Sequence, residues 1–142
     1  MKNIYNDPID FKSYKDKVLI VVNVAKLNEL YDKYPRDKFD IIAFPSNQFN
    51  QEKGSQEEIK QRIMEKFSPK FAIFAPIYVN GEDESAIYKF LKQNCQSWLG
   101  SGIKWNFTKF IVNKEGFPVS RSLPTTSPKV ISLYKCSFEN KL

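Results

Sequence analysis

A run of apolar residues from Lys17 to Ala25, "KVLIVVNVA", constrains the fold more than any other feature of this sequence. The run is rich in β-branched residues and lacks polar alternation, which is typical of a strand covered on both faces. A second run of the same kind, "DIIAFP" over Asp40–Pro45, follows after a short amphipathic stretch. Two buried strands separated by one helix predict a βαβ unit with parallel strands.

The stretch between these two strands is short. Parallel strands need a crossover of about a dozen residues or more, so Lys26–Phe39 closes the unit tightly. A helix that starts at Lys26 also has no capping residue. Pro35 ends this helix. The helical spacing is given by Leu27, Leu30, Tyr31 and Tyr34.

Two further helices follow. Ser55 and Glu58 have the spacing of a capping box, in which the hydroxyl and the carboxylate each satisfy a free N–H at the helix start. The apolar stripe of this helix is Ile59, Ile63 and Phe67. The turn at Asn80-Gly81 precedes the next helix. Its buried face is predicted to be Ile87, Phe90, Leu91 and Asn94.

The last third of the sequence predicts a hairpin and a helix. "IKWNFTKFIVN" (Ile103–Asn113) and "FPVSRS" (Phe117–Ser122) have strand composition and are separated by the turn "NKEG". A final helix is expected from Ser127, with Pro128 in its first turn. Its apolar face is Val130, Ile131, Leu133 and Tyr134.

The predicted order is therefore βαβ-α-ββα, which one mixed central sheet with helices on both faces satisfies. This is an α/β fold of the thioredoxin-like arrangement. The 142 residues fit one domain, and no repeat or linker divides residues 1–142.

Charge and composition limit the function classes. The net charge is +6, with 22 Lys and Arg against 16 acids, which favours anionic partners. We interpret the excess as dispersed for solubility, because no clustered basic stripe predicts a nucleic-acid partner. The chain has no His and two Cys without motif spacing, which argues against a zinc site and excludes a His-based triad.

The sequence has no run of roughly 18 apolar residues, the length that a membrane-spanning helix requires. Its first residues, "MKNIYNDPIDF", also lack the apolar centre of a signal peptide. We therefore expect an intracellular, cytoplasmic protein.

Two motifs at a specific separation resemble those of the glutathione peroxidase family. They are "FPSNQF" (Phe44–Phe49), which "NQEKGSQEEI" follows, and "KWNFTKF" (Lys104–Phe110). "KVLIVVNVA", "VNGED" and "NKEG" lie in the matching order, so the resemblance covers nearly the whole chain.

The resemblance implies a thiol-dependent peroxidase that acts in the response to oxidative stress. A Cys or selenocysteine would reduce hydrogen peroxide or organic and lipid hydroperoxides, and glutathione or a thioredoxin-type protein would restore it without a bound cofactor. By motif position, Gln48, Trp105 and Asn106 would stabilise the reactive anion with amide and indole N–H groups. Each also has a simpler interpretation: a loop hydrogen bond, a core aromatic residue and a turn residue.

The reactive residue of the family has no counterpart in this sequence. Family members carry it after the first long strand, in a stretch resembling "NVASKCGxT", whereas "NVA" at Asn23–Ala25 is followed directly by "KLNELYDKY". The N-terminal part is similarly shortened where the family has a hairpin. We interpret the missing stretch as a loop that the intact molecule carries just after Ala25. The alternative is a catalytically inactive thioredoxin-fold protein that relays oxidation or binds a partner.

Other positions bear on the mechanism. Neither Cys95 nor Cys136 lies at a strand-to-helix junction, so both are interpreted as structural or incidental thiols. In thioredoxin-dependent relatives a resolving cysteine lies near the position of Met64, which argues against a two-cysteine mechanism through that helix. The segment before "KWNF" is short, as in monomeric members of the family. Such a monomer could approach lipid hydroperoxides at an anionic membrane surface.

Overall fold

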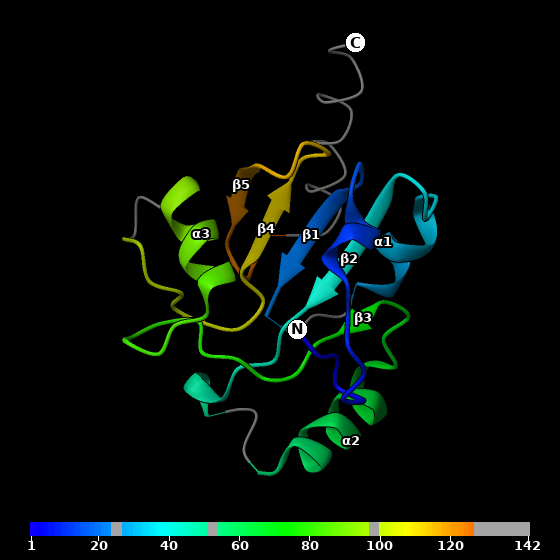
Figure 1. Ribbon diagram of the computed structural model, residues 1–142. Helices are drawn as coiled ribbons and strands as arrows, with labels where there is room; N and C mark the ends of the chain where they lie inside the picture. The colour runs from blue at the N-terminus through cyan, green and yellow to red at the C-terminus, as the bar shows by residue number, and fades with distance from the viewer. Residues whose placement is uncertain (24–26, 51–53, 97–99, 127–142) are drawn as a thin grey trace.

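A five-stranded mixed sheet forms the centre of the computed structural model, which describes residues 1–23, 27–50, 54–96 and 100–126 (Figure 1). The strand order is β3-β2-β1-β4-β5, with β2 parallel to both β1 and β3, and β4 antiparallel to β1 and β5. The strands are β1 (Val18–Val22), β2 (Phe39–Ala43), β3 (Ala72–Ile73), β4 (Lys109–Val112) and β5 (Pro118–Ser122).

The predicted βαβ unit is confirmed. β1 and β2 pair in parallel with Ile20 opposite Ile41, and α1 (Asn28–Lys33) lies between them in sequence. Leu27 occupies the position before α1 and makes no side-chain hydrogen bond to it, as expected for a helix without a capping residue. The crossover therefore closes with a helix of less than two turns.

Helices cover both faces of the sheet, and the strand alternation explains how. Ile20 faces α1 and the predicted capping-box helix α2 (Gln56–Phe67), whereas Val21, the next residue in β1, faces α3 (Ala86–Asn94). The capping box of α2 is present, because the Ser55 N–H donates to Glu58 Oε2 at 2.7 Å and the Glu58 N–H donates to Ser55 Oγ at 3.3 Å.

Three details of the prediction are wrong or untested. The predicted order βαβ-α-ββα counts one helix between the second strand and the hairpin. The structure has both of the helices that the spacing indicated, α2 and α3, and between them a two-residue strand, β3, that was not predicted. The extended segment predicted from Ile103 becomes a strand only at Lys109, because Phe107 has a left-handed backbone with φ of 69°. The final helix and its apolar face lie outside the described residues.

The buried face of α3 also differs from the prediction. Tyr88, Leu91 and Lys92 are buried, whereas Phe90 is 44% exposed and Asn94 is exposed. Helical spacing allows either the predicted stripe, which includes Phe90, or the observed one, which includes Tyr88. The packing of the Tyr88 ring selects the observed stripe. Tyr88 packs edge-on between two rings, with centroid distances of 6.1 Å to Phe44 and 6.1 Å to Phe110.

The chain before β1 reaches the α3 side of the sheet through Ile9 and the 3₁₀ helix η1 (Phe11–Tyr14), whereas Ile4 packs on the opposite face. Phe11 stacks on Phe74 with a centroid distance of 5.5 Å. Within the described parts of the chain, no helix is long and apolar enough to cross a membrane.

We expect Tyr14→Phe to reduce the loss of stability at alkaline pH. Burial, together with the negative charge of Asp40, raises the pKa of Tyr14 to about 12. The folded state therefore retains a proton that the unfolded state loses near pH 10. The contribution of the Tyr14 hydroxyl to the free energy of unfolding is therefore complete below about pH 10 and is lost as the pH rises towards 12. Urea unfolding between pH 9 and 12 measures it. Tyr78→Phe, at an exposed ring, is the matched control, and an equal pH dependence in both variants would contradict the assignment.

Candidate functional site

The residues singled out by the motifs lie near the carboxyl ends of β1 and β2. Because these strands are parallel, their carboxyl ends share one edge of the sheet, where α/β proteins commonly bind ligands. Gln48 lies in the 3₁₀ helix η2 (Asn47–Phe49), which follows β2. Trp105 and Asn106 lie in a turn before β4 rather than in the strand itself.

Asn106 is held by a residue at the end of β1. Its side chain is 1% exposed, and Asn23 Nδ2 donates to Asn106 Oδ1 at 3.1 Å and to the Trp105 carbonyl at 3.3 Å. The Phe107 N–H donates to the Asn23 carbonyl at 3.1 Å. The bond from Asn23 to the Asn106 oxygen therefore fixes the orientation of the Asn106 amide, whose other end is an NH₂ donor group.

The Trp105 ring lies beside η2. Its side chain is 49% exposed, and its ring makes a tilted contact with Phe49 at a centroid distance of 6.0 Å. Among the described residues the indole N–H donates to no acceptor, although an indole N–H usually finds one when it is buried. The ring is therefore an accessible donor next to the segment that carries Gln48.

Gln48 fixes a neighbouring loop. Its Oε1 accepts from the Val79 N–H at 2.7 Å and from the Asn80 N–H at 3.0 Å, and its Nε2 donates to the Asn80 carbonyl at 2.8 Å. The simpler interpretation, a loop hydrogen bond, therefore describes most of what this amide does. An NH₂ group carries two hydrogens, so one donor of Gln48 remains beyond the bond to Asn80.

Asn80 connects the Gln48 segment with the Trp105 segment. Its Nδ2 donates to the Ile103 carbonyl at 2.8 Å, and its Oδ1 accepts from the Ile103 N–H at 2.7 Å. Lys92 Nζ donates to Asn80 Oδ1 at 3.3 Å and to the Val79 carbonyl at 3.1 Å. The two predicted donor segments are therefore tied through one loop, to which the Gln48 amide bonds from one side and Ile103 from the other.

A buried lysine braces the turn on its other side. Lys109 Nζ donates to the carbonyls of Phe107, Leu123 and Pro124 at 2.9, 3.4 and 3.2 Å. Burial lowers the pKa of Lys109. These bonds hold the chain that follows Asn106 in its left-handed turn.

Sequence reasoning missed Asn23 and Asn80. Asn23 is the single polar residue that interrupts "LIVVNVA", and an amide in a fully apolar run could have indicated a buried hydrogen bond. For Asn80 the sequence predicts only a turn beside Gly81, which has φ of 89°. The side-chain bonds of Asn80 join residues 23 positions apart, so no local pattern indicated them.

The expected nucleophile position, just after Ala25, lies outside the described residues, as does Cys136. Cys95 is a free, half-buried thiol at the end of α3. Among the described residues, no group of three or more His, Cys, Asp or Glu side chains could hold a metal ion.

We expect the Cys95 thiol to react slowly at neutral pH. Burial raises its pKa, and the Arg121 guanidinium opposes this only in part, so little thiolate forms. In a Cys136→Ser background, the iodoacetamide reaction rate against pH should have a higher midpoint in the folded protein than in urea. A lower midpoint in the folded protein would make Cys95 a candidate nucleophile.

Comparisons with known proteins agree in one family. The glutathione peroxidase family model matches residues 1–92. A probable phospholipid hydroperoxide glutathione peroxidase of Helianthus annuus is 43% identical over 139 positions, covering 89% of this chain and 77% of the relative. A probable mitochondrial phospholipid hydroperoxide glutathione peroxidase 6 of Arabidopsis thaliana is 44% identical over 140 positions, covering 90% of this chain and 60% of the relative.

Solved structures agree with the sequence comparisons. The crystal structure of T. cruzi GPX1 superposes with a TM-score of 0.74 at 30% identity, covering 94% of each chain. A thiol-disulfide isomerase from Corynebacterium glutamicum superposes with a TM-score of 0.68 at 12% identity, covering 96% of this chain and 90% of that one, which shows a shared fold alone. The predicted thioredoxin-like fold is confirmed.

Proposed function

Because this chain belongs to the glutathione peroxidase family, we propose that it reduces hydroperoxides at the carboxyl ends of β1 and β2. The observation that carries the proposal is the Asn23–Asn106 hydrogen bond. It anchors two candidate donors, Trp105 and Asn106, directly beside the end of the strand that the family's reactive residue follows. In the intact molecule this residue would be a Cys or selenocysteine just after Ala25.

The chemistry requires a stabilised anion. A thiolate attacks the peroxide O–O bond, takes one oxygen to become a sulfenic acid and releases an alkoxide, which is protonated to an alcohol. A first reductant thiol forms a mixed disulfide and releases water, and a second thiol restores the thiolate. N–H donors of Trp105, Asn106 and Gln48 would favour the anion without titrating near neutral pH.

The reductant is a thiol, either glutathione or a thioredoxin-type protein. The α2 position expected for a resolving cysteine holds Met64, whose sulfur accepts a hydrogen bond from the Tyr5 hydroxyl at 3.6 Å. This favours reduction by glutathione directly at the sulfenic acid. The relatives named for phospholipid hydroperoxides support lipid hydroperoxides as substrates. We propose that the protein approaches them as a monomer, with its net charge of +6 attracted to an anionic membrane surface.

The location within the cell stays a prediction. One relative is named as mitochondrial, so the cytoplasmic location expected from the sequence competes with an organelle. Fluorescence imaging of the tagged full-length protein distinguishes the two.

One sequence observation favours the second candidate function, a catalytically inactive redox relay or binding protein. The sequence has no Cys between Asn23 and Asn94. The alignment with the Helianthus annuus relative spans 139 positions, but it includes only 89% of this 142-residue chain, which is about 126 residues. Because this number is smaller than 139, some aligned residues of the relative have no counterpart in this sequence.

Intact mass and a graft test the proposal together. A mass of 16.6 kDa for the natural protein, with no peroxidase activity, would favour the inactive protein. A heavier mass with glutathione-dependent consumption of hydroperoxide supports the enzyme.

The graft tests the donor cluster itself. The corresponding segment of the Helianthus annuus relative, inserted after Ala25, should confer peroxidase activity. Trp105→Phe should then lower its rate at least roughly a hundredfold, the cost typical of losing one preorganised donor. Trp98→Phe, at the other Trp of the sequence, is the control. A grafted protein whose rate is the same with and without the Trp105 indole would remove the donor cluster from the mechanism.

A further inference from the structure

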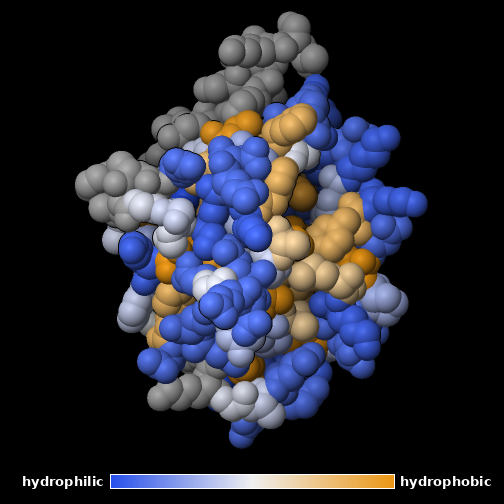
Figure 2. Space-filling view, turned by 60° about the vertical axis from the view of Figure 1, so that its left-hand side comes forward, coloured by the Kyte–Doolittle hydropathy of each residue, from blue (hydrophilic) through white to orange (hydrophobic). Residues whose placement is uncertain are grey.

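A hollow on the α3 side of the sheet is apolar and large. It has a volume of about 710 Å³ and lies between η1 and α3. Figure 2 shows hydrophobic residues gathered in a recess that hydrophilic residues border. The floor is formed by Leu19, Val21, Ile42 and Val112. We call this the η1–α3 hollow.

The η1–α3 hollow is distinct from the donor cluster. Its lining includes none of Asn23, Gln48, Trp105 or Asn106. It extends to Lys17, which precedes β1, whereas the donor cluster lies at the opposite, carboxyl end of that strand. A ligand in the hollow would therefore not occupy the proposed reaction site.

The walls leave apolar side chains uncovered. Phe90 of α3 is 44% exposed and Phe11 of η1 is 37% exposed, and both line the hollow. An exposed apolar surface in a concave site is a common feature of ligand pockets, whose volumes are roughly 300–1,000 Å³. The composition of the walls suits a hydrocarbon chain.

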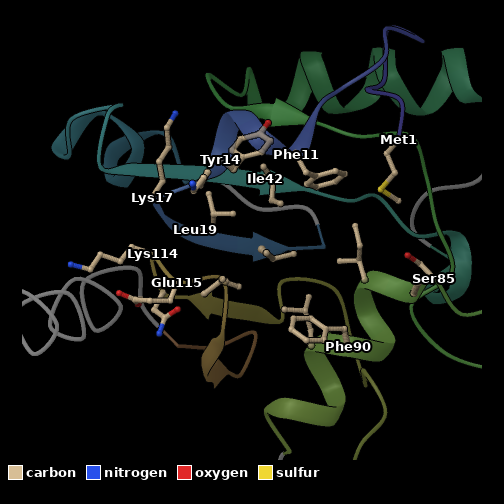
Figure 3. A pocket seen from close by; sticks show the side chains of 18 residues that line it. Met1, Phe11, Tyr14, Lys17, Leu19, Ile42, Ser85, Phe90, Lys114 and Glu115 are labelled. Carbon is tan, nitrogen blue, oxygen red and sulfur yellow. The ribbon is translucent and has the colours of Figure 1, made fainter.

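One end of the hollow is basic. Figure 3 shows Lys17, Lys114 and Glu115 at this end, with Met1, Ser85 and Phe90 at the other. Lys15 also lines it. Lys17 pairs with Asp40 at 3.5 Å, whereas Lys15 and Lys114 have no ion pair among the described residues. The three lysines at this end of the hollow carry three positive charges, and Glu115 and Asp40 carry two negative charges. This end therefore has one positive charge in excess.

We propose that the η1–α3 hollow binds a free long-chain fatty acid. The hydrocarbon chain lies over the floor strands towards Phe90, and the carboxylate lies at the end that carries Lys15 and Lys114. A single carboxylate matches the single excess positive charge. An apolar hollow with a few polar groups at one end fixes the direction of the ligand. The proposal does not depend on peroxidase activity.

Displacement of a fluorescent probe tests binding. The full chain is titrated with 11-(dansylamino)undecanoic acid, which is then displaced with oleate, oleyl alcohol or butyrate. We expect oleate to displace the probe at concentrations at least about tenfold lower than either of the other two, because only oleate has both the chain and the charge. Equal displacement by oleyl alcohol, or none by oleate, would overturn the proposal.

A charge placed in the hollow gives a sharper test. Phe90→Glu should weaken oleate binding at least about tenfold, because it places a carboxylate beside the hydrocarbon chain. Val119→Glu makes the same kind of change at an apolar residue that is 37% exposed and does not line the hollow, and it should bind as the parent does. Equal weakening in both variants, with far-UV circular dichroism unchanged, would overturn the proposal.

The basic end has its own variant pair. Lys15→Gln/Lys114→Gln should weaken oleate binding several-fold and leave the affinity for oleyl alcohol unchanged. Lys33→Gln/Lys89→Gln removes the same net charge away from the hollow and should change neither. An equal effect of both pairs would make the attraction a property of the net charge and overturn the assigned carboxylate position.

Two further measurements separate the binding of a free fatty acid from binding to a membrane, and the second of them uses only the unaltered protein. The first measures how much protein co-floats with phosphatidylglycerol vesicles. If neither oleate nor the Phe90→Glu substitution lowers that amount, the protein binds a membrane surface instead, and the proposal is overturned. A diazirine-labelled fatty acid should crosslink to peptides containing residues 11–21 and 85–91 of the unaltered protein. Crosslinks confined to other peptides would overturn the site.

Discussion

Glu84→Ala should destabilise this protein by about 3–5 kcal/mol, the cost typical of breaking a buried ion pair. Glu84 Oε1 lies 2.8 Å from Lys92 Nζ, and the two side chains are only 13% and 10% exposed. Within the described structure Glu84 Oε1 has no hydrogen-bond partner beyond this ion pair. Removing the carboxylate leaves the Lys92 ammonium buried with two neutral acceptors among the described residues, on Val79 and Asn80.

Urea unfolding followed by circular dichroism measures this effect. Glu82→Ala is the matched control, because Glu82 is exposed in the same loop and has no ion pair among the described residues. It should change stability by no more than about 0.5 kcal/mol. Glu84→Leu/Lys92→Met, which replaces both charges, should be far less destabilising than Glu84→Ala. A loss below about 1 kcal/mol in Glu84→Ala would show that water reaches Lys92.

Asn23→Ala should lower the free energy of unfolding by about 2–4 kcal/mol and leave Trp105 and Asn106 less firmly held. Asn23 is fully buried and donates to both Asn106 Oδ1 and the Trp105 carbonyl. The substitution removes a donor from two acceptors at the site and leaves a small cavity, and each lost buried hydrogen bond costs about 1–3 kcal/mol. Urea unfolding measures the loss, and Trp105 fluorescence in a Trp98→Phe background reports the ring's surroundings.

A double-mutant cycle makes the test specific to this hydrogen bond. Asn23→Ala and Asn106→Ala should show a coupling of at least about 0.5 kcal/mol, since directly bonded residues are not additive. Asn94→Ala, which removes an exposed amide that donates to the Phe90 carbonyl, is the control and should be additive with Asn106→Ala. Additivity of the first pair would mean that Asn23 does not hold Asn106, and the support for the proposed site would be lost.

Much of the fold could be predicted because it depends on neighbours in sequence. β1 and β2 follow from uninterrupted β-branched runs, and α2 begins where its capping box places it. Local spacing was less informative for α3, where two overlapping stripes fit the helical period. The choice between them depended on the rings of Phe44 and Phe110, which come from other parts of the chain.

The candidate site could be predicted only as a set of residues. The motifs identified Gln48, Trp105 and Asn106, but they indicated neither that Gln48 binds the backbone of Val79 and Asn80 nor that Trp105 precedes the strand. Hydrogen bonds across 31 and 32 positions depend on which loops the sheet brings together. No spacing rule in the sequence reports that.

By itself the sequence determined the element types, the capping box, the parallel pair and the family, because each is written in short runs or motifs of the chain. Tertiary structure alone decided that Asn23 meets Asn106 across 83 positions, that Lys92 is buried beside Glu84, and that an apolar hollow opens between η1 and α3. Local patterns fix backbone conformation through neighbouring residues. The meeting of distant polar groups depends on strand order and register, which the packing of the whole chain selects.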